Sequence, residues 1–288
     1  MKSFADYKKD APNWITMANG EFYPDILESA CELYKPVLVL FEQLIKTSES
    51  SERLLREIMD VHQQWMRIQL CRVFRKYVSP QTPVEMLKNK SKLTMICANY
   101  GKYFRTIDRV QSAFSSRPMP DEALCALLWE YKDRGKKGYD LTERFFELFQ
   151  SAFPKLRIEG PKRAGADVLM KSVFPDYPNP TRPVDFVIKN EKDDILAIGL
   201  ARYDGDRGGA QEDDRTGGYA NCAKEILQYT KAKRLSTKVI FVNDGPGLLL
   251  GSMWNDYSSL EKIDANRIIV LTLRMFNTRL TAKWLKSK

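Results

Sequence analysis

Acidic and basic side chains gather in two short stretches of the second half of the chain. In Pro183-Val184-Asp185-Phe186-Val187-Ile188, Asp185 stands at the start of an apolar run. A strand there would hold the carboxylate and leave its oxygens open to a hard cation. Carboxylates that lie close together bind Mg²⁺, which activates water and neutralises the charge that develops on a phosphodiester. The second stretch follows another apolar run and contains Asp204, Asp206, Glu212, Asp213 and Asp214.

Each stretch also has a purely structural interpretation. Asp185 could be an acid at a strand edge that faces water. The later acids could form a capping and salt-bridge network, with Asp213 or Asp214 at a helix N-terminus. Helix capping does not require so many charges, which favours the functional interpretation. A literal Pro175-Asp176 pair is set aside because prolines 178 and 180 make that segment a loop.

Several other chemistries lack the residues that they need. His62 is the single histidine, which excludes histidine-metal nucleases, HExxH hydrolases and most Ser-His or Cys-His nucleophile systems. The five cysteines are scattered and show no CxxC spacing, which argues against a disulfide framework and a zinc site and favours buried thiols in a reducing cytoplasm. The glycine-rich residues 205–209 do not precede a GK[ST] sequence, so a phosphate-binding P-loop is not predicted.

The chain carries a surplus of positive charge. Its 288 residues include 46 Lys and Arg against 37 Asp and Glu, and residues 46–117 alone contain 14 basic and 6 acidic side chains. A concentrated surplus favours a polyanion such as DNA, although a solvated helical surface has the same composition. The predicted DNA contacts are Arg67, Arg72, Arg75, Lys76, Lys88, Lys90, Lys92, Asn99, Lys102, Arg105, Arg207 and Arg215.

Apolar spacing predicts a mostly helical first part of the chain. The charged turn at 133–138 separates this N-terminal region, residues 1–134, from a second region, residues 135–288. The N-terminal region is expected to contact DNA or to mediate dimerisation. Its helices are expected at 25–46 with a kink or break at Pro36, at 51–78, from 83, at 92–114 and at 121–133.

The second region combines a helix with strands. Residues 139–153 have helical spacing, whereas 184–189 and 195–203 are strand-like, and the polar turn between these two predicts a β-hairpin. A helix at 219–232 and strands at 238–243 and 267–273 follow. This order describes a mixed α/β core of the α+β kind. No apolar window approaches the roughly 18 residues needed to span a bilayer, so neither membrane insertion nor secretion is expected.

These elements resemble the core of type II restriction endonucleases with the PD-(D/E)xK nuclease fold. The resemblance covers about residues 138–275: an acidic helix near Glu143, the run from Pro183 to Glu191, a second strand, and Val239–Gly247, which contains an aspartate-glycine turn. It implies a restriction-endonuclease-like mixed central sheet flanked by helices. It also implies that Asp185 is the metal-binding aspartate and that Glu143 is the helical glutamate that joins the site.

The chain departs from the family's pattern in the second strand. The motif calls for an acid and a lysine two residues apart, but hairpin spacing puts Gly199 and Ala201 at these positions. Either the acid has moved, or the register differs, or the site is inactive. The expected replacements are Asp204 or Glu212 as the second carboxylate, and Arg202 or Lys224 as the positive charge near the scissile phosphate.

Two functions of different classes follow. The first is a Mg²⁺-dependent type II endonuclease that cuts double-stranded DNA at a specific site. It would be cytoplasmic, and a homodimer is expected because symmetric DNA sites suit symmetric proteins. The second is a non-catalytic DNA-binding protein on a degenerate nuclease fold, which the missing acid-x-lysine pair favours. A third interpretation is a basic α/β protein whose acidic loop binds a protein partner.

Overall fold

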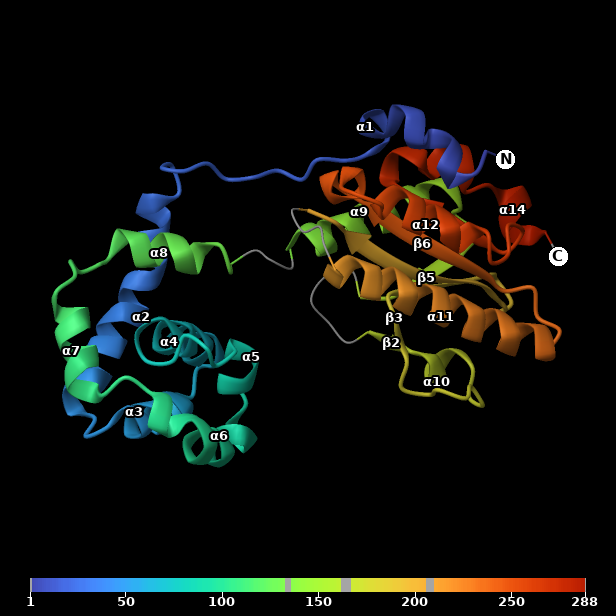
Figure 1. The fold of residues 1–288 in the computed structure, drawn as a ribbon. Helices are drawn as coiled ribbons and strands as arrows, with labels where there is room; N and C mark the ends of the chain where they lie inside the picture. The colour runs from blue at the N-terminus through green and yellow to red at the C-terminus, as the bar shows by residue number, and fades with distance from the viewer. Residues whose placement is uncertain (1, 133–135, 162–166, 206–209, 288) are drawn as a thin grey trace. The chain divides into compact units, whose positions relative to one another are not determined.

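The chain folds into two compact units (Figure 1). The computed structural model describes residues 2–132, 136–161, 167–205 and 210–287 and, within them, all side chains except those of 136–139 and 210–215. The helical unit is Gly20–Arg134, and the α/β unit combines Met1–Asn19 with Gly135–Lys288.

The first 19 residues belong to the α/β unit, which corrects the predicted N-terminal region of residues 1–134. Phe4 stacks on Trp254 with ring centroids 4.5 Å apart, and its backbone N–H donates to Glu261 Oε2 at 2.8 Å. Asp244, at the end of a central strand, accepts hydrogen bonds from the backbone N–H groups of Thr16 at 2.6 Å and Leu273 at 3.0 Å. These partners lie more than 200 residues away, so local spacing could not assign the segment to a unit.

The helical unit is built around one buried cluster that draws on residues from Ala30 to Leu128. Its exposed faces carry most of the charged side chains, and its buried residues recur at helical spacing. Its elements are α2 (Leu27–Thr47), α3 (Ser51–Asp60), α4 (Gln64–Tyr77), α5 (Val84–Leu87), η2 (Lys90–Lys92), α6 (Leu93–Tyr100), η3 (Gly101–Tyr103), α7 (Ile107–Ser115) and α8 (Glu122–Trp129).

Two predicted helix boundaries in this unit are wrong. Helix α2 runs unbroken through Pro36, whose exposed position leaves the freed carbonyl of the preceding turn near water. The single helix predicted at 51–78 is two helices, because Val61 and Gln63 have extended backbones. Arg67 stabilises this break by donating from Nη1 to the Val61 carbonyl at 2.8 Å. His62 lies in the break and is exposed.

The α/β unit contains a five-stranded mixed sheet with the order β1-β4-β5-β6-β7. The pairs β1–β4 and β4–β5 are antiparallel, and the pairs β5–β6 and β6–β7 are parallel. The expected mixed α/β core is therefore confirmed. Its strands are β1 (Arg157–Glu159), β2 (Val168–Leu169), β3 (Pro183–Val184), β4 (Phe186–Lys189), β5 (Ile195–Tyr203), β6 (Lys238–Asp244) and β7 (Ile268–Leu271).

Helices cover both faces of this sheet (Figure 1). The long helices α9 and α11 carry out the packing, α9 against β5 and α11 against β6. A small second sheet pairs β2 with β3. The helical elements are η1 (Phe4–Asp10), α1 (Ala11–Trp14), α9 (Lys136–Ala152), α10 (Met170–Val173), α11 (Ala210–Ala232), η4 (Pro246–Leu249), α12 (Met253–Glu261), η5 (Leu273–Met275), α13 (Phe276–Arg279) and α14 (Ala282–Lys286).

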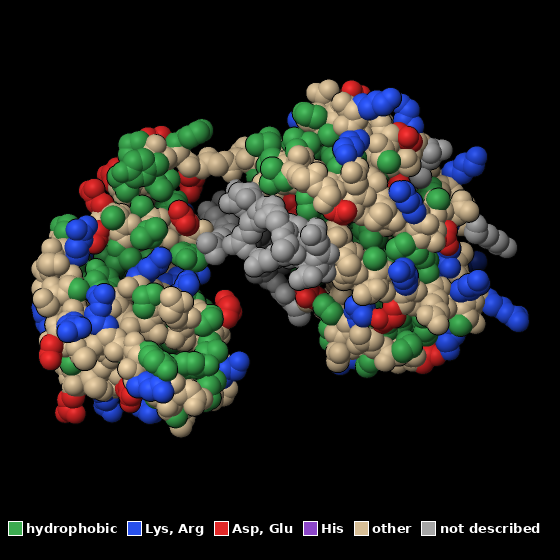
Figure 2. Space-filling model, in the orientation of Figure 1, with side chains coloured by type: hydrophobic (Ala, Val, Ile, Leu, Met, Phe, Trp, Pro, Cys, Tyr) green, Lys and Arg blue, Asp and Glu red, His purple; other side chains and the backbone are tan. Residues whose placement is uncertain are grey.

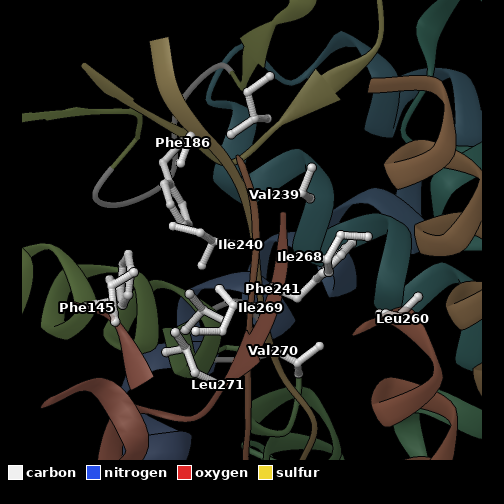
Figure 3. Close-up of a cluster of buried hydrophobic side chains, with 14 of the residues drawn as sticks. Phe145, Phe186, Val239, Ile240, Phe241, Leu260, Ile268, Ile269, Val270 and Leu271 are labelled. Carbon is white, nitrogen blue, oxygen red and sulfur yellow. The ribbon is translucent and has the colours of Figure 1, made fainter. Parts of the chain in front are cut away.

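Strands β6 and β7 are buried on both faces, which is why their sequences are continuous apolar runs. Figure 3 shows alternate residues on opposite sides of the sheet: Ile240 and Ile269 on one side, Val239 and Ile268 on the other. This alternation fixes which face each polar side chain at the strand ends can reach. Among the described residues, no helix combines the length and apolar character needed to cross a membrane.

Candidate active site

Asp185 lies between β3 and β4 and is bonded to β5 through both its backbone and its side chain. Its N–H donates to the Gly199 carbonyl at 3.0 Å, and its Oδ2 accepts from the Ala201 N–H at 2.7 Å. The carboxylate is therefore held beside the end of β5. Burial raises its pKa to about 6, because a poorly solvated carboxyl group disfavours its charged form.

The register of the hairpin places Asp185 one residue away from the predicted positions. Phe186 pairs with Gly199, so the next residue, Leu200, lies opposite Asp185. Gly199 faces the other side, where a Cβ would overlap the Phe186 ring. Since side chains alternate along a strand, Arg202 shares a face with Leu200. The motif position for the acid is thus Leu200, and the position for the lysine is Arg202.

This face of β5 is covered by α11. Phe241, which pairs with Leu200, packs against Tyr219 of α11 with ring centroids 5.3 Å apart. Phe186, on the opposite face, packs against Phe145 of α9 at 5.0 Å. Asp185 and Arg202 therefore share the α11 side of the sheet.

Asp204 holds the guanidinium of Arg202 in place. Its side chain is 3% exposed, and its Oδ1 accepts from Arg202 Nε. Its Oδ2 accepts from the Tyr257 hydroxyl at 3.0 Å. Both oxygens are committed, so Asp204 anchors Arg202, which corrects its predicted role as the second metal-binding carboxylate.

Tyr219 lies among these charged groups. Burial raises its pKa above the ordinary value, the charge of Arg202 opposes this rise, and the charges of Asp185 and Asp204 add to it. The effects show that all four side chains are within electrostatic range of one another. Tyr219 also packs against Tyr257 at 6.3 Å between ring centroids, which closes the group on the α11 and α12 side.

Asp167 is a second carboxylate beside Asp185, and the sequence interpretation missed it. Strand β2 begins directly after it, and the antiparallel pair Val168↔Val184 places Asp167 opposite Asp185. The charge of Asp167 contributes to the raised pKa of Asp185. A signal was present in the sequence, since Asp167 stands directly before a short apolar run, as Asp185 does.

Other predicted site residues are not assembled with Asp185. Lys224 is exposed on α11, five residues after Tyr219 and so on a different face of the helix. Glu143, on α9, is absent from the charges that act on Asp185. Within the described part of the chain, no three His, Cys, Asp or Glu side chains form a metal-binding group, so the predicted set of Asp185, Asp204 and Glu143 is corrected. The side chain of Glu212 lies outside the described residues.

Asp185 and Asp167 fit a Mg²⁺ site of the kind that is completed by a substrate. Mg²⁺ is commonly held by one or two carboxylates together with substrate phosphates rather than by a full set of protein ligands. Two neighbouring carboxylates, one of them with a raised pKa, form a place where an added cation is electrostatically favoured.

Half of the predicted DNA contacts are used within the helical unit. Besides Arg67, Arg72 donates to Gln69 Oε1 at 2.9 Å, and Arg75 Nε donates to the Pro80 carbonyl at 3.1 Å. Lys88 forms an ion pair with Glu85. Arg207 and the side chain of Arg215 lie outside the described residues. The exposed members of the predicted set are Lys76, Lys90, Lys92, Asn99, Lys102 and Arg105.

No protein-family model matches the sequence, and neither a curated protein nor a solved structure is significantly similar to the chain. The residues and their geometry therefore carry the functional argument.

Proposed function

We propose that the protein is a Mg²⁺-dependent endonuclease that hydrolyses phosphodiester bonds in double-stranded DNA. One observation carries the proposal: the carboxylates of Asp185 and Asp167 lie beside each other, on the same side of the sheet as the anchored guanidinium of Arg202. Paired carboxylates and a fixed cation are the groups that phosphodiester hydrolysis requires.

Asp185 and Asp167 would hold the metal ion. When bound, Mg²⁺ supplies a more acidic water and neutralises charge on the phosphate oxygens. Ala201 keeps the Asp185 carboxylate in one orientation through the N–H bond to Oδ2 and leaves Oδ1 for the ion. The second strand lacks an acid at Leu200, and Asp167 of the neighbouring small sheet is the replacement that we propose.

Arg202 would bind the scissile phosphate. A guanidinium can donate two parallel hydrogen bonds to a phosphate, and its charge persists at every physiological pH. Asp204 and Tyr257 hold Arg202 from behind, so little freedom is lost when the phosphate binds. Tyr219 shields the group from bulk water, which strengthens the interaction between Arg202 and the phosphate.

The finer fold assignment belongs to this proposal. Helix α9, the β4–β5 hairpin, α11 and β6 follow one another in the order that the resemblance to PD-(D/E)xK endonucleases implies. The exposed basic residues of the helical unit would bind the DNA backbone, and a homodimer would suit a symmetric site. The five free cysteines suit a cytoplasmic protein.

Cleavage of a mixed-sequence duplex, with Mg²⁺ or with EDTA, tests the proposal. The wild type should give discrete fragments with Mg²⁺ alone. Asp185→Asn keeps an acceptor for the Ala201 N–H but removes the charge, so cleavage should fall at least 100-fold while DNA affinity in EDTA is retained. The matched control is Asp193→Asn, an exposed aspartate in the hairpin turn whose positive φ also suits asparagine.

The non-catalytic DNA-binding protein is favoured by Leu200, which stands where the motif calls for an acid. It predicts salt-sensitive DNA binding and no cleavage by the wild type with Mg²⁺, Mn²⁺ or Co²⁺. That result would overturn the nuclease proposal.

Metal binding can be tested without any activity. An ion that binds the folded state alone raises the melting temperature. Millimolar Mg²⁺ should raise that of the wild type and of Asp193→Asn, and the rise should be smaller in Asp167→Asn and absent in Asp185→Asn. An equal rise in all four proteins would place the bound Mg²⁺ elsewhere.

A further inference from the structure

A cavity of about 380 Å³ opens in the helical unit, between the segment that follows α4 and the turn that follows α6. Its size lies within the range of small-ligand pockets, about 300–1,000 Å³. It is lined by Ser79, Pro80, Gln81, Thr82, Pro83, Met86, Tyr100 and Tyr103, and is called the tyrosine pocket below.

The walls of the tyrosine pocket are held by contacts beneath it. The Arg105 N–H donates to the Val78 carbonyl at 3.0 Å and joins the two segments that form the walls. The Ser79 and Thr82 hydroxyls are hydrogen bonded at 2.7 Å in the buried base of the loop. The pocket is therefore formed in the absence of a ligand, which lowers the entropic cost of binding.

Two tyrosines at the pocket are exposed although aromatic rings favour burial. Tyr103 is 72% exposed and Tyr100 is 38% exposed. The ammonium of Lys102 lies 5.0 Å from the centroid of the Tyr103 ring. An exposed ring beside a cationic side chain suits a flat, electron-rich ligand that carries negative charge.

The charge around the pocket selects among such ligands. Residues 62–107 contain nine Lys and Arg and a single acid, Glu85, which is paired with Lys88. Lys76, Lys102 and Arg105 are exposed and are close in sequence to the lining residues. Figure 2 shows Lys and Arg side chains beside hydrophobic ones on the visible face of the helical unit. Positive charge of this density favours a phosphate-bearing ligand over a proline-rich peptide.

We propose that the tyrosine pocket accepts an unpaired nucleobase, which stacks on Tyr103 while Lys76, Lys102 and Arg105 contact the flanking phosphates. Stacking on an aromatic ring tolerates every base, because every base has a π-face. The helical unit would then bind a bulged, mismatched or single-stranded nucleotide more tightly than a fully paired one. The proposal rests on the proposed function in its choice of nucleic acid as the ligand.

Fluorescence anisotropy of the full chain in EDTA tests this proposal apart from cleavage. The probes are a labelled duplex with one unpaired adenine, the same duplex fully paired, and a single strand of equal length. The wild type should prefer the bulged duplex, and Tyr103→Leu should weaken that binding about 10-fold with little effect on the paired duplex. Tyr103→Trp should retain the preference because it keeps a stacking surface.

Phe22→Leu is the matched control, since Phe22 is 76% exposed in the same unit but stands beside Glu21 and close to Asp25. It should bind all three probes as the wild type does. Equal affinity of the wild type for bulged and paired duplexes, or an unchanged preference in Tyr103→Leu, would overturn the proposal, as would binding of a proline-rich peptide with no binding of the bulged duplex. If the preference is found but Mg²⁺-dependent cleavage is not, the nuclease proposal fails and this one stands.

Discussion

The side chain of Asp185 accepts a hydrogen bond from the backbone N–H of Ala201 at 2.7 Å, so a residue that precedes one strand satisfies the end of the next. The bond ties the carboxylate to β5, two residues from Asp204, which anchors Arg202. Any shift of the hairpin would move the carboxylate and the guanidinium together. The acidic and basic parts of the candidate site are thus coupled through backbone structure.

Asp185 should make stability depend on pH in the absence of metal. Its pKa in the folded state, about 6, is above the ordinary value of 3.8. Between these values the unfolded carboxyl group loses its proton while the folded one keeps it, so stability falls as pH rises. The cost should reach about 2–3 kcal/mol above pH 6 and vanish below about pH 4.

Asp185→Asn should therefore raise the free energy of unfolding at pH 8 and change it little at pH 4. Urea denaturation in EDTA at both pH values measures this difference. A variant that loses cleavage but gains stability at pH 8 would have a defect in chemistry rather than in folding. An equal effect at both pH values would contradict the raised pKa.

Tyr257→Phe should lower the free energy of unfolding by about 1–2 kcal/mol. The substitution removes the donor to Asp204 Oδ2 and leaves that buried oxygen without its partner. Urea denaturation at pH 8 provides the measurement, and Tyr103→Phe, whose ring is exposed, is the control that should change nothing. A neutral Tyr257→Phe would mean that this hydroxyl does not support the anchor of Arg202.

Gly199→Ala should destabilise the hairpin, because a Cβ at this position overlaps the ring of Phe186. Overpacking of this kind costs about 1–3 kcal/mol. Phe186→Leu shortens the opposing side chain, so the double variant should lose at least about 1 kcal/mol less than the two single losses together. Additive losses in denaturant titrations would show that the ring of Phe186 is not what excludes a side chain from position 199.

Lys90→Gln should weaken DNA binding equally for different sequences and lower its dependence on salt. Lys90 is exposed, and each phosphate contact contributes about 0.9 to the slope of log affinity against log salt concentration. Lys46→Gln removes an equal charge from a lysine that is paired with Glu42 and should leave the slope unchanged. Equal slopes for the wild type and Lys90→Gln would remove Lys90 from the DNA-binding surface.

The sequence predicted the elements whose pattern is local. Strand β5 has the predicted bounds, the hairpin turn at 190–194 lies between β4 and β5, and the apolar runs of β6 and β7 are buried. Periodicity reports which side chains are buried, and turn residues mark where strands end. Asp185, Arg202 and Asp204 could be singled out for the same reason, because each stands at the end of an apolar run.

The tertiary structure alone decided how these side chains are combined. The register Phe186↔Gly199 puts Arg202 rather than residue 201 on the side of Asp185, and a shift of one residue would have reversed that result. Asp167 reaches Asp185 through pairing of strands 16 residues apart, and Tyr257 reaches Asp204 across 53 residues. Single-residue register and long-range pairing depend on how whole faces pack together, and the spacing of residues along one segment carries no record of either.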